Sequence, residues 1–205
     1  MTKVKICGIQ NTHEAKDAVR AGADLVGFVF AESKRKITPE NAQEIAASIP
    51  NHVQKVGVFV NESPDAIHKI AEQVPLDYVQ LHGDETIEDS SQLKIPFIKV
   101  VSLKEELSSE TVPLDPLASY HLLDSAKGPY RGGNGTTFNW ELISQTNIPL
   151  ESLMIAGGLN ENNIQNLLQR VTPAIVDVSS GVETDGRKDS TKVKQFIKRV
   201  KEMKE

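Results

Sequence analysis

The chain has 205 residues, of which 39% are hydrophobic and 25% charged, with a formal net charge of −5 and a single cysteine. This composition is typical of one soluble globular domain. The net charge argues against a nucleic-acid partner, and one cysteine excludes an intramolecular disulfide or a cysteine-built metal cluster. The longest uncharged apolar stretch, residues 25–31, is far shorter than the roughly 20 residues that span a bilayer. The N-terminus also lacks the apolar segment of a signal peptide, so we expect a cytoplasmic protein with no membrane partner.

Short β-branched segments alternate with longer helical segments along the whole chain. Strands are expected to begin near eight residues: Lys3, Asp24, Gln54, Leu76, Pro96, Ser119, Ser152 and Ala174. A helical stretch follows each strand, and the clearest ones span residues 38–49, 61–73, 160–170 and 189–203. Strict strand–helix alternation predicts a parallel sheet with helical crossovers.

The spacing of the strands favours a closed barrel over an open doubly wound sheet. Strand starts recur regularly, and no G-x-G-x-x-G motif of a dinucleotide fold follows the first strand. We therefore predict a single (β/α)8 TIM barrel that occupies residues 1–205. The longest connections follow the second and sixth strands, on the side where barrel enzymes hold their chemistry.

Two glycine-containing loops predict a phosphate site. The seventh strand runs into Gly157 and Gly158, and the eighth strand runs into Ser180 and Gly181. Glycine lets backbone N–H groups approach an anion, and a following helix N-terminus adds a favourable dipole. Each loop alone is equally explained as a tight turn. Their joint position after strands seven and eight favours phosphate.

Cys7 ends the first strand, where it is either a small buried hydrophobe or a thiolate that acts as a general base. Lys5 has the same strand parity and would also point inward. A lysine inside a barrel needs a partner, and Asp177 on the neighbouring eighth strand could supply one. This pair has either a structural or a direct role.

Other polar residues follow further strands. Asp124 ends the sixth strand and is a candidate general acid or a loop cap. The glycine-rich loop 128–135 after it is a mobile lid, a backbone approach to ligand or a plain loop. Arg35 either grips a carboxylate in a bidentate fork or belongs to a solvated basic run. His82 either contacts a ligand or is a satisfied rim histidine. The histidines show no metal-ligand spacing, so we expect no metal.

In this order, the motifs closely resemble the phosphoribosylanthranilate isomerase family. The resemblance covers the chain from residue 3 to about residue 200. The segments that carry it are residues 5–9 (KICGI), 80–83 (QLHG), 123–125 (LDS), 132–135 (GGNG) with Phe138 and Trp140, 156–159 (AGGL) and 177–183 (DVSSGVE).

The resemblance implies a cofactor-free Amadori rearrangement in tryptophan biosynthesis. N-(5-phosphoribosyl)anthranilate would become 1-(2-carboxyphenylamino)-1-deoxyribulose 5-phosphate, with Asp124 as the acid and Cys7 as the base. Arg35 would bind the anthranilate carboxylate. The remaining substrate contacts would be Gly157, Gly158, Ser180, Gly181, His82 and Asp177. Lys34 stands where the family commonly has proline, and Asn134 where it has threonine or serine.

Four alternative functions fit the sequence less well. A histidine-pathway aminoaldose isomerase would end its first strand with aspartate rather than Cys7. A metal-dependent epimerase needs clustered histidine and aspartate ligands, and indole-glycerol-phosphate synthase uses a catalytic lysine at a strand end. A non-catalytic phosphate binder would lack the acid or the base. We expect a small phosphorylated aminoaldose as partner, bound by a monomer or weak homodimer.

Overall fold

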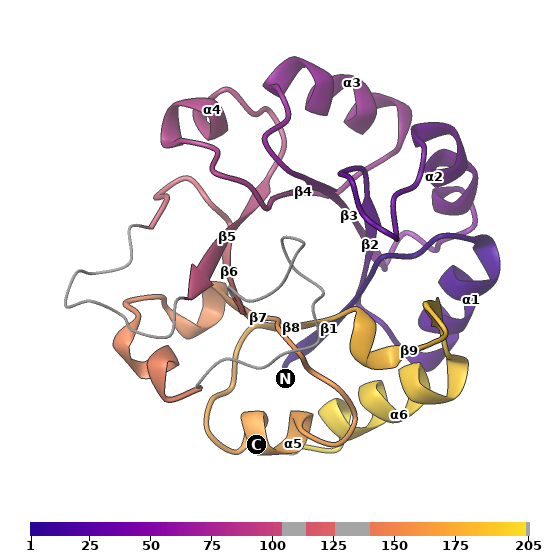
Figure 1. Ribbon diagram of the computed structural model, residues 1–205, viewed down its shortest axis with the longest axis vertical. Coiled ribbons are helices and arrows are strands. Elements are labelled where there is room, and N and C mark those ends of the chain that lie inside the picture. The colour runs from indigo at the N-terminus through magenta and orange to yellow at the C-terminus, as the bar shows by residue number, and fades with distance from the viewer. Residues whose placement is uncertain (104–113, 126–139, 204–205) are drawn as a thin grey trace.

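The computed structural model describes residues 1–103, 114–125 and 140–203, and within them eight parallel strands close into a barrel (Figure 1). Each strand pairs with its sequence neighbours, and β1 pairs with β8 to close the circle. The strands are β1 (Lys3–Cys7), β2 (Leu25–Val29), β3 (Gln54–Phe59), β4 (Tyr78–Leu81), β5 (Phe97–Leu103), β6 (Tyr120–Ser125), β7 (Leu153–Ile155) and β8 (Ile175–Val178). The predicted barrel is confirmed.

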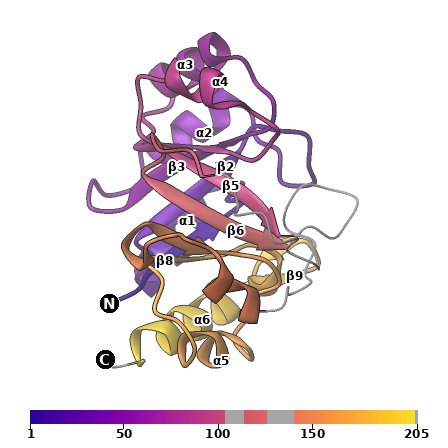
Figure 2. The ribbon, with the colours of Figure 1, turned by 90° about the vertical axis from the view of Figure 1, so that its left-hand side faces the viewer.

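Helices surround the barrel on the outside (Figures 1 and 2). The α-helices are α1 (Thr12–Ala21), α2 (Pro39–Ala46), α3 (Pro64–Gln73), α4 (Ile87–Ser91), α5 (Ile164–Leu168) and α6 (Ser190–Lys201). Three 3-10 helices are η1 (Trp140–Gln145), η2 (Leu150–Ser152) and η3 (Ser180–Val182). A small antiparallel hairpin of β9 (Glu183–Thr184) and β10 (Arg187–Lys188) follows β8.

Polar capping residues set where the helices begin. The Thr38 side chain accepts a hydrogen bond from the backbone of Asn41 at the start of α2, and Ser63 does the same for Ala66 in α3. In both helices a proline occupies the first turn, where its missing N–H costs nothing. Asp189 caps α6, which lies within the segment 189–203 that the sequence predicts to be helical.

Several helices are shorter than predicted, and one is of another type. The helix expected over 38–49 covers Pro39–Ala46, and the one expected over 189–203 covers Ser190–Lys201. The helix expected over 61–73 begins only at Pro64, because Asn61 adopts a left-handed φ of 51°. The helix expected over 160–170 covers only Ile164–Leu168, because asparagine side chains hydrogen-bond the backbone before it. After β6 the described residues form η1 and η2 in place of an α-helix. The helix expected after β5 lies outside the described residues.

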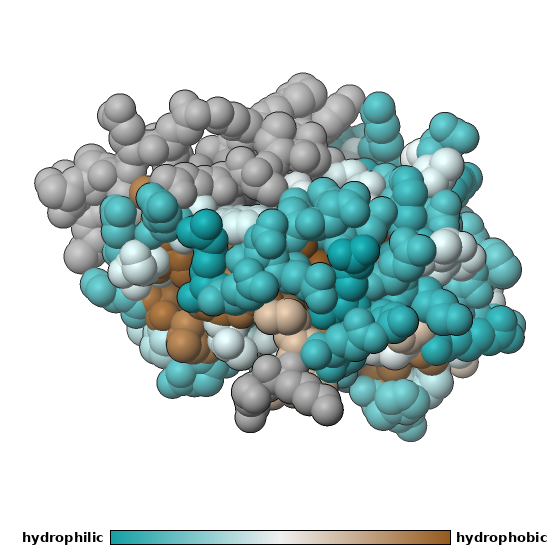
Figure 3. Space-filling model, turned by 90° about the horizontal axis from the view of Figure 1, so that it is seen from below, coloured by the Kyte–Doolittle hydropathy of each residue, from teal (hydrophilic) through white to brown (hydrophobic). Residues whose placement is uncertain are grey.

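Alternation along the strands divides the core into two parts. An outer core packs the strands against the helices, and the barrel interior holds a second cluster. The interior cluster comprises Leu25, Val56, Ile98, Val100, Leu122, Met154, Ala156 and Ile175. The surface seen in Figure 3 is mostly hydrophilic, with smaller hydrophobic areas. No helix among the described residues is long and apolar enough to cross a membrane.

Candidate active site

The carboxyl ends of the strands bring the predicted site residues to one rim of the barrel. Cys7, Asp124 and Asp177 lie on β1, β6 and β8. Arg35, His82 and the two glycine loops follow β2, β4, β7 and β8. Because all strands are parallel, these ends meet at the same face. β7 and β8 separate β1 from β6, so the two glycine loops lie between the candidate base and the candidate acid.

Lys5 and Asp177 form a buried ion pair beneath this rim. The two residues are register partners on β1 and β8, and Lys5 Nζ lies 3.0 Å from Asp177 Oδ2. The Lys5 side chain is fully buried. Burial lowers the pKa of Lys5, but the charge of Asp177 and the hydrogen bond to it outweigh burial, and the pKa is raised. The predicted inward orientation and pairing of Lys5 are confirmed. Among the described residues, Asp177 Oδ1 has no hydrogen-bond partner.

Cys7 is buried next to this pair, with 8% of the residue exposed. Its register partner is Gly27, where a Cβ atom would lie only 2.9 Å from the Cys7 sulfur. Burial raises the pKa of the Cys7 thiol, the charges of Lys5 and Lys188 oppose it, and the carboxylate of Asp177 adds to it. The net direction is upward, so the thiol is favoured over the thiolate before substrate binds.

Asp124 belongs to a row of polar side chains that links β6 to β4. Its Oδ2 atom lies 3.4 Å from His82 Nε2, and His82 Nδ1 lies 3.2 Å from Gln80 Nε2. A Gln80 amide that donates to Nδ1 leaves the ring hydrogen on Nε2, facing the Asp124 carboxyl. Gln80 Oε1 is buried and finds no partner among the described residues. His82 thus contacts the candidate acid, a neighbour the sequence did not assign to it.

Arg35 is held by a carboxylate that the sequence analysis gave no role. Its Nε and Nη2 atoms donate to the two carboxylate oxygens of Glu183, each at 2.7 Å. The Arg35 side chain is 18% exposed, so its interpretation as part of a solvated basic run is wrong. Its predicted binding of the substrate carboxylate stays a prediction.

Lys188 completes this cluster. Its ammonium donates to Glu183 Oε1 at 2.5 Å and to the carbonyl and hydroxyl oxygens of Ser179 at 3.1 and 3.3 Å. Burial lowers the pKa of Lys188 despite the charge of Glu183. For Glu183, burial acts upward, but hydrogen bonds and charge from Arg35 and Lys188 lower its pKa.

Sequence reasoning missed Glu183 and Lys188 because it did not anticipate the hairpin that carries them. The signal was present, since Asp185-Gly186 is a strong hairpin turn. Asp185 and Gly186 adopt positive φ angles of 51° and 76° in the structure.

The two glycine loops lie against each other. Gly157 and Gly158 have left-handed φ angles of 84° and 62°. A Cβ atom on Gly181 would lie 1.8 Å from the carbonyl oxygen of Leu159. The β7 loop does not run directly into a helix as predicted, because α5 begins only at Ile164. The loop after β8 runs into the 3-10 helix η3, which begins at Ser180.

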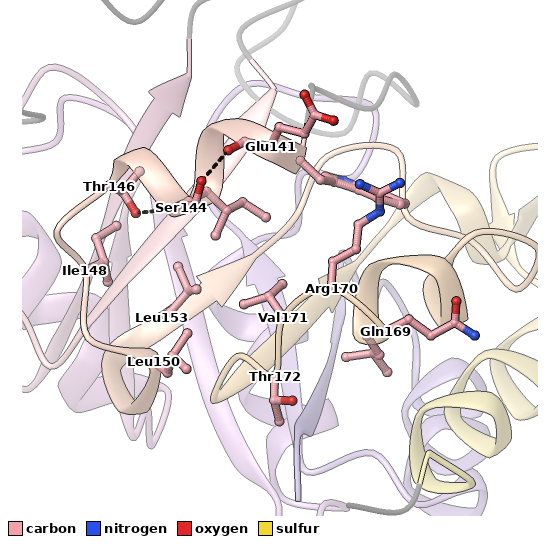
Figure 4. A pocket seen from close by; sticks show the side chains of 13 residues that line it. Glu141, Ser144, Thr146, Ile148, Leu150, Leu153, Gln169, Arg170, Val171 and Thr172 are labelled. Carbon is pink, nitrogen blue, oxygen red and sulfur yellow. Dashed lines mark hydrogen bonds between the residues drawn. The ribbon is translucent and has the colours of Figure 1, made fainter. Parts of the chain in front are cut away.

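A pocket of about 600 Å³ lies outside the barrel between η1, η2 and the connection from α5 to β8 (Figure 4). Apolar side chains such as Ile148, Leu153 and Val171 line it. Its hydrogen bonds join neighbouring residues within η1, such as Ser144 to the carbonyl of Glu141. None of the predicted site residues lines this pocket, so it is separate from the candidate active site.

Some predictions remain open. The part of the chain that the structure describes contains no group of three His, Cys, Asp or Glu residues that could hold a metal ion. The absence of a metal therefore stays a prediction. The glycine-rich loop 128–135, with Asn134, and Phe138 lie outside the described residues.

Comparison with known proteins identifies the family. The family model for N-(5'phosphoribosyl)anthranilate (PRA) isomerase matches residues 4–199. The N-(5'-phosphoribosyl)anthranilate isomerase of Bacillus mycoides (strain KBAB4) is 53% identical over 201 residues, 98% of either chain. That of Bacillus cereus (strain Q1) is 50% identical with the same coverage.

Solved structures agree. Monomers generated from the dimeric phosphoribosylanthranilate isomerase of Thermotoga maritima superpose with a TM-score of 0.85 at 41% identity, covering 98% of this chain and 99% of that one. A phosphoribosyl anthranilate isomerase in complex with reduced 1-(o-carboxyphenylamino)-1-deoxyribulose 5-phosphate gives a TM-score of 0.79 at 38% identity, with the same coverage. The chain belongs to the N-(5'-phosphoribosyl)anthranilate isomerase family.

Proposed function

We propose that Cys7 and Asp124 are the base and the acid with which this chain isomerises N-(5'-phosphoribosyl)anthranilate in tryptophan biosynthesis. Family membership supports the reaction. The observation that carries the two roles is their placement. A buried thiol and a buried carboxyl occupy the same rim, on strands that flank the phosphate loops. A sugar phosphate anchored on those loops would have its ribose between the two groups.

The chemistry needs one acid and one base. Protonated Asp124 gives its proton to the furanose ring oxygen, the bond from C1′ to that oxygen breaks, and a Schiff base forms between C1′ and the nitrogen. The Cys7 thiolate then removes the proton from C2′, and the electron pair moves to give an enolamine. Protonation of C1′ and loss of the C2′ hydroxyl proton yield the ketone. The oxidation of C2′ is matched by the reduction of C1′ and the protons balance, so the acid and the base complete the reaction without an external oxidant or reductant.

The remaining residues hold the substrate. The phosphate lies on the backbone of Gly157, Gly158, Ser180 and Gly181. Arg35 binds the anthranilate carboxylate, and His82 and Asp177 contact the sugar. The unpartnered buried atom Asp177 Oδ1 supports this, because a ribose hydroxyl would give it the hydrogen bond that no described residue supplies. Binding energy from both ends of the substrate positions the reacting carbon.

We also propose that residues 1–205 form one catalytic domain, that the protein is a monomer or weak homodimer, and that it is cytoplasmic. Closure of the barrel between β1 and β8 supports the single domain. A lone cysteine without a disulfide partner fits a reducing compartment.

The test follows the loss of anthranilate-type fluorescence when freshly made N-(5'-phosphoribosyl)anthranilate is mixed with protein. We expect wild type to catalyse it and Cys7→Ser and Asp124→Asn each to lower kcat by roughly 10² to 10⁴-fold. Asp17→Asn on the outer helix α1 is the control and should retain full activity. EDTA should have no effect.

Three outcomes would contradict parts of the proposal. Activity that survives Cys7→Ser would move the base elsewhere, and activity that survives Asp124→Asn would move the acid. A folded wild type that binds substrate without converting it would favour a non-catalytic binder.

A further inference from the structure

The guanidinium of Arg35 is held in place on one edge. Its Nε and Nη2 atoms meet both oxygens of Glu183 at 2.7 Å. A guanidinium carries five N–H donors in a fixed plane. Nη1 makes no hydrogen bond to the described residues, so the edge formed by Nη1 and the second Nη2 hydrogen remains available. That edge matches a second carboxylate in bidentate geometry.

The stem of Arg35 is also fixed. It lies against Gly8, where a Cβ atom would be only 2.5 Å from Arg35 Cδ. Gly8 has a left-handed φ of 81°, so both backbone conformation and space favour glycine here. The arginine is therefore confined from its aliphatic stem to its inner edge.

Glu183 is itself anchored and does not act as a loose counter-ion. Its Oε1 accepts from Lys188 Nζ, and its backbone carbonyl accepts from Lys192 Nζ at 2.7 Å. The Lys188 side chain is 3% exposed and that of Glu183 is 9% exposed. Removing Glu183 from this cluster would leave a buried ammonium without its anion, which is costly. The cluster is joined to the candidate base, because Ser179 binds Lys188 and donates through Oγ to the Cys7 carbonyl at 3.0 Å.

Lys188 changes the net charge of the cluster. Glu183 alone would cancel the charge of Arg35 and remove its attraction for an anion. With Lys188 added, two cations and one anion leave a net charge of +1. Glu183 can therefore orient the arginine while the cluster still attracts a carboxylate.

We propose that Glu183, supported by Lys188, is a positioning residue that directs the outer edge of Arg35 at the ring carboxylate of the substrate. Glu183 thereby sets the selectivity for aminoaldoses that carry this carboxylate. The inference rests on the proposed function for the identity of the substrate. In the opposite case, Glu183 occupies the site of the substrate carboxylate and is displaced when substrate binds. Removing Glu183 would then strengthen binding of the carboxylate.

The experiment measures binding of two stable probes by calorimetry. One is reduced 1-(o-carboxyphenylamino)-1-deoxyribulose 5-phosphate, and the other is the same compound without the ring carboxylate. The Kd of the carboxylate-free probe divided by the Kd of the carboxylate probe reports how strongly the carboxylate is recognised. We expect Glu183→Gln to lower this ratio roughly tenfold, since a charge-assisted hydrogen-bond pair loses its geometry. The carboxylate-free probe should bind almost as in wild type.

Matched variants test whether Glu183 acts through Arg35. Glu32→Gln lies on the same loop as Arg35 with its side chain 87% exposed, and it should leave both affinities unchanged. In an Arg35→Gln background, Glu183→Gln should cause no further loss of the ratio, because the two residues act as one unit. If Glu183→Gln does not fold, Glu183→Asp keeps the charge but shortens the reach, and it should lower the ratio in the same direction.

Equal weakening of both probes would reduce Glu183 to a structural role in the hairpin. Tighter binding of the carboxylate probe by Glu183→Gln would show that the substrate carboxylate displaces Glu183. Either result would overturn the inference. Because binding is measured without turnover, a wild type that binds both probes but does not convert substrate would contradict the proposed function alone.

Discussion

At the scale of single residues, the surroundings of Cys7 determine when it can take a proton. Its burial raises the thiol pKa more than the cations of Lys5 and Lys188 lower it. A raised pKa means that the proton is held at neutral pH and released only as the pH increases. The thiolate is the reactive form of cysteine. In the substrate-free protein, the candidate base is therefore stored mainly as a thiol.

This predicts the pH dependence of alkylation at Cys7. We expect its rate with iodoacetamide to rise with pH and to be half-maximal above about pH 8.5, the ordinary value for a cysteine. Lys5→Met should shift the curve to still higher pH, because a neighbouring cation is lost. Mass spectrometry measures the reaction without ambiguity, since the sequence contains one cysteine. A rate that has already levelled off at pH 7 would contradict the raised pKa.

The residue scale also shows where prediction from the sequence succeeds and where it ends. Strand parity placed Lys5 and Cys7 inside the barrel, and barrel closure identified Asp177 as the partner of Lys5. The partner of Arg35 could not be read in this way. Arg35 and Glu183 lie 148 positions apart, one on the loop after β2 and the other on the hairpin after β8. No strand period relates these two segments.

At the scale of elements, the site depends on close contact between the β7 and β8 loops. Gly181 allows this contact, because a Cβ atom there would lie 1.8 Å from the Leu159 carbonyl oxygen. We expect Gly181→Ala to separate the loops and to weaken binding of inorganic phosphate roughly tenfold, as backbone N–H groups lose the anion. Titration calorimetry with phosphate measures this.

Gly186→Ala is a control for backbone substitution in the same region. Gly186 has a φ of 76° but nothing within 4 Å of an added Cβ, so alanine brings strain without a clash. It should lower stability by about 1 kcal/mol and leave phosphate affinity unchanged. If both variants lose affinity equally, the contact at Gly181 is not what holds the phosphate loop.

At the scale of elements, helix boundaries also show where prediction from the sequence ends. Threonine followed by proline marked the start of α2 at Pro39, but the helix predicted from Asn61 begins three residues later, at Pro64 of α3. The polar run before α5 resembled a helix start, but its asparagine side chains bind the backbone of the loop instead. Asn163 Nδ2 donates to the Gly158 carbonyl at 2.9 Å. Side chains that satisfy local backbone groups compete with helix formation, and the sequence alone does not show which competitor prevails.

At the scale of the whole molecule, contacts near the chain ends reinforce the closure of the barrel. Lys201 in the last helix donates to Asp24 Oδ2 at 2.7 Å, and the backbone of Val4 in β1 donates to the same oxygen at 2.8 Å. The buried pair of Lys5 and Asp177 joins the same two ends from inside. The rim that holds the candidate base therefore depends on residues from both ends of the sequence, and the molecule is expected to lose this site as one unit when it unfolds.

The exposed hydrophobic side chains of the molecule predict its assembly state. Large exposed hydrophobic side chains among the described residues are Met1, Ile87, Leu117 and Leu150, which come from separate elements. A permanent dimer interface usually buries about 2,000 Å² or more and is rich in apolar side chains. We therefore expect sedimentation equilibrium to give a mass near 22.5 kDa at roughly 1 μM, with association only at much higher concentration. Twice this mass at every concentration would show an obligate dimer and contradict the expectation.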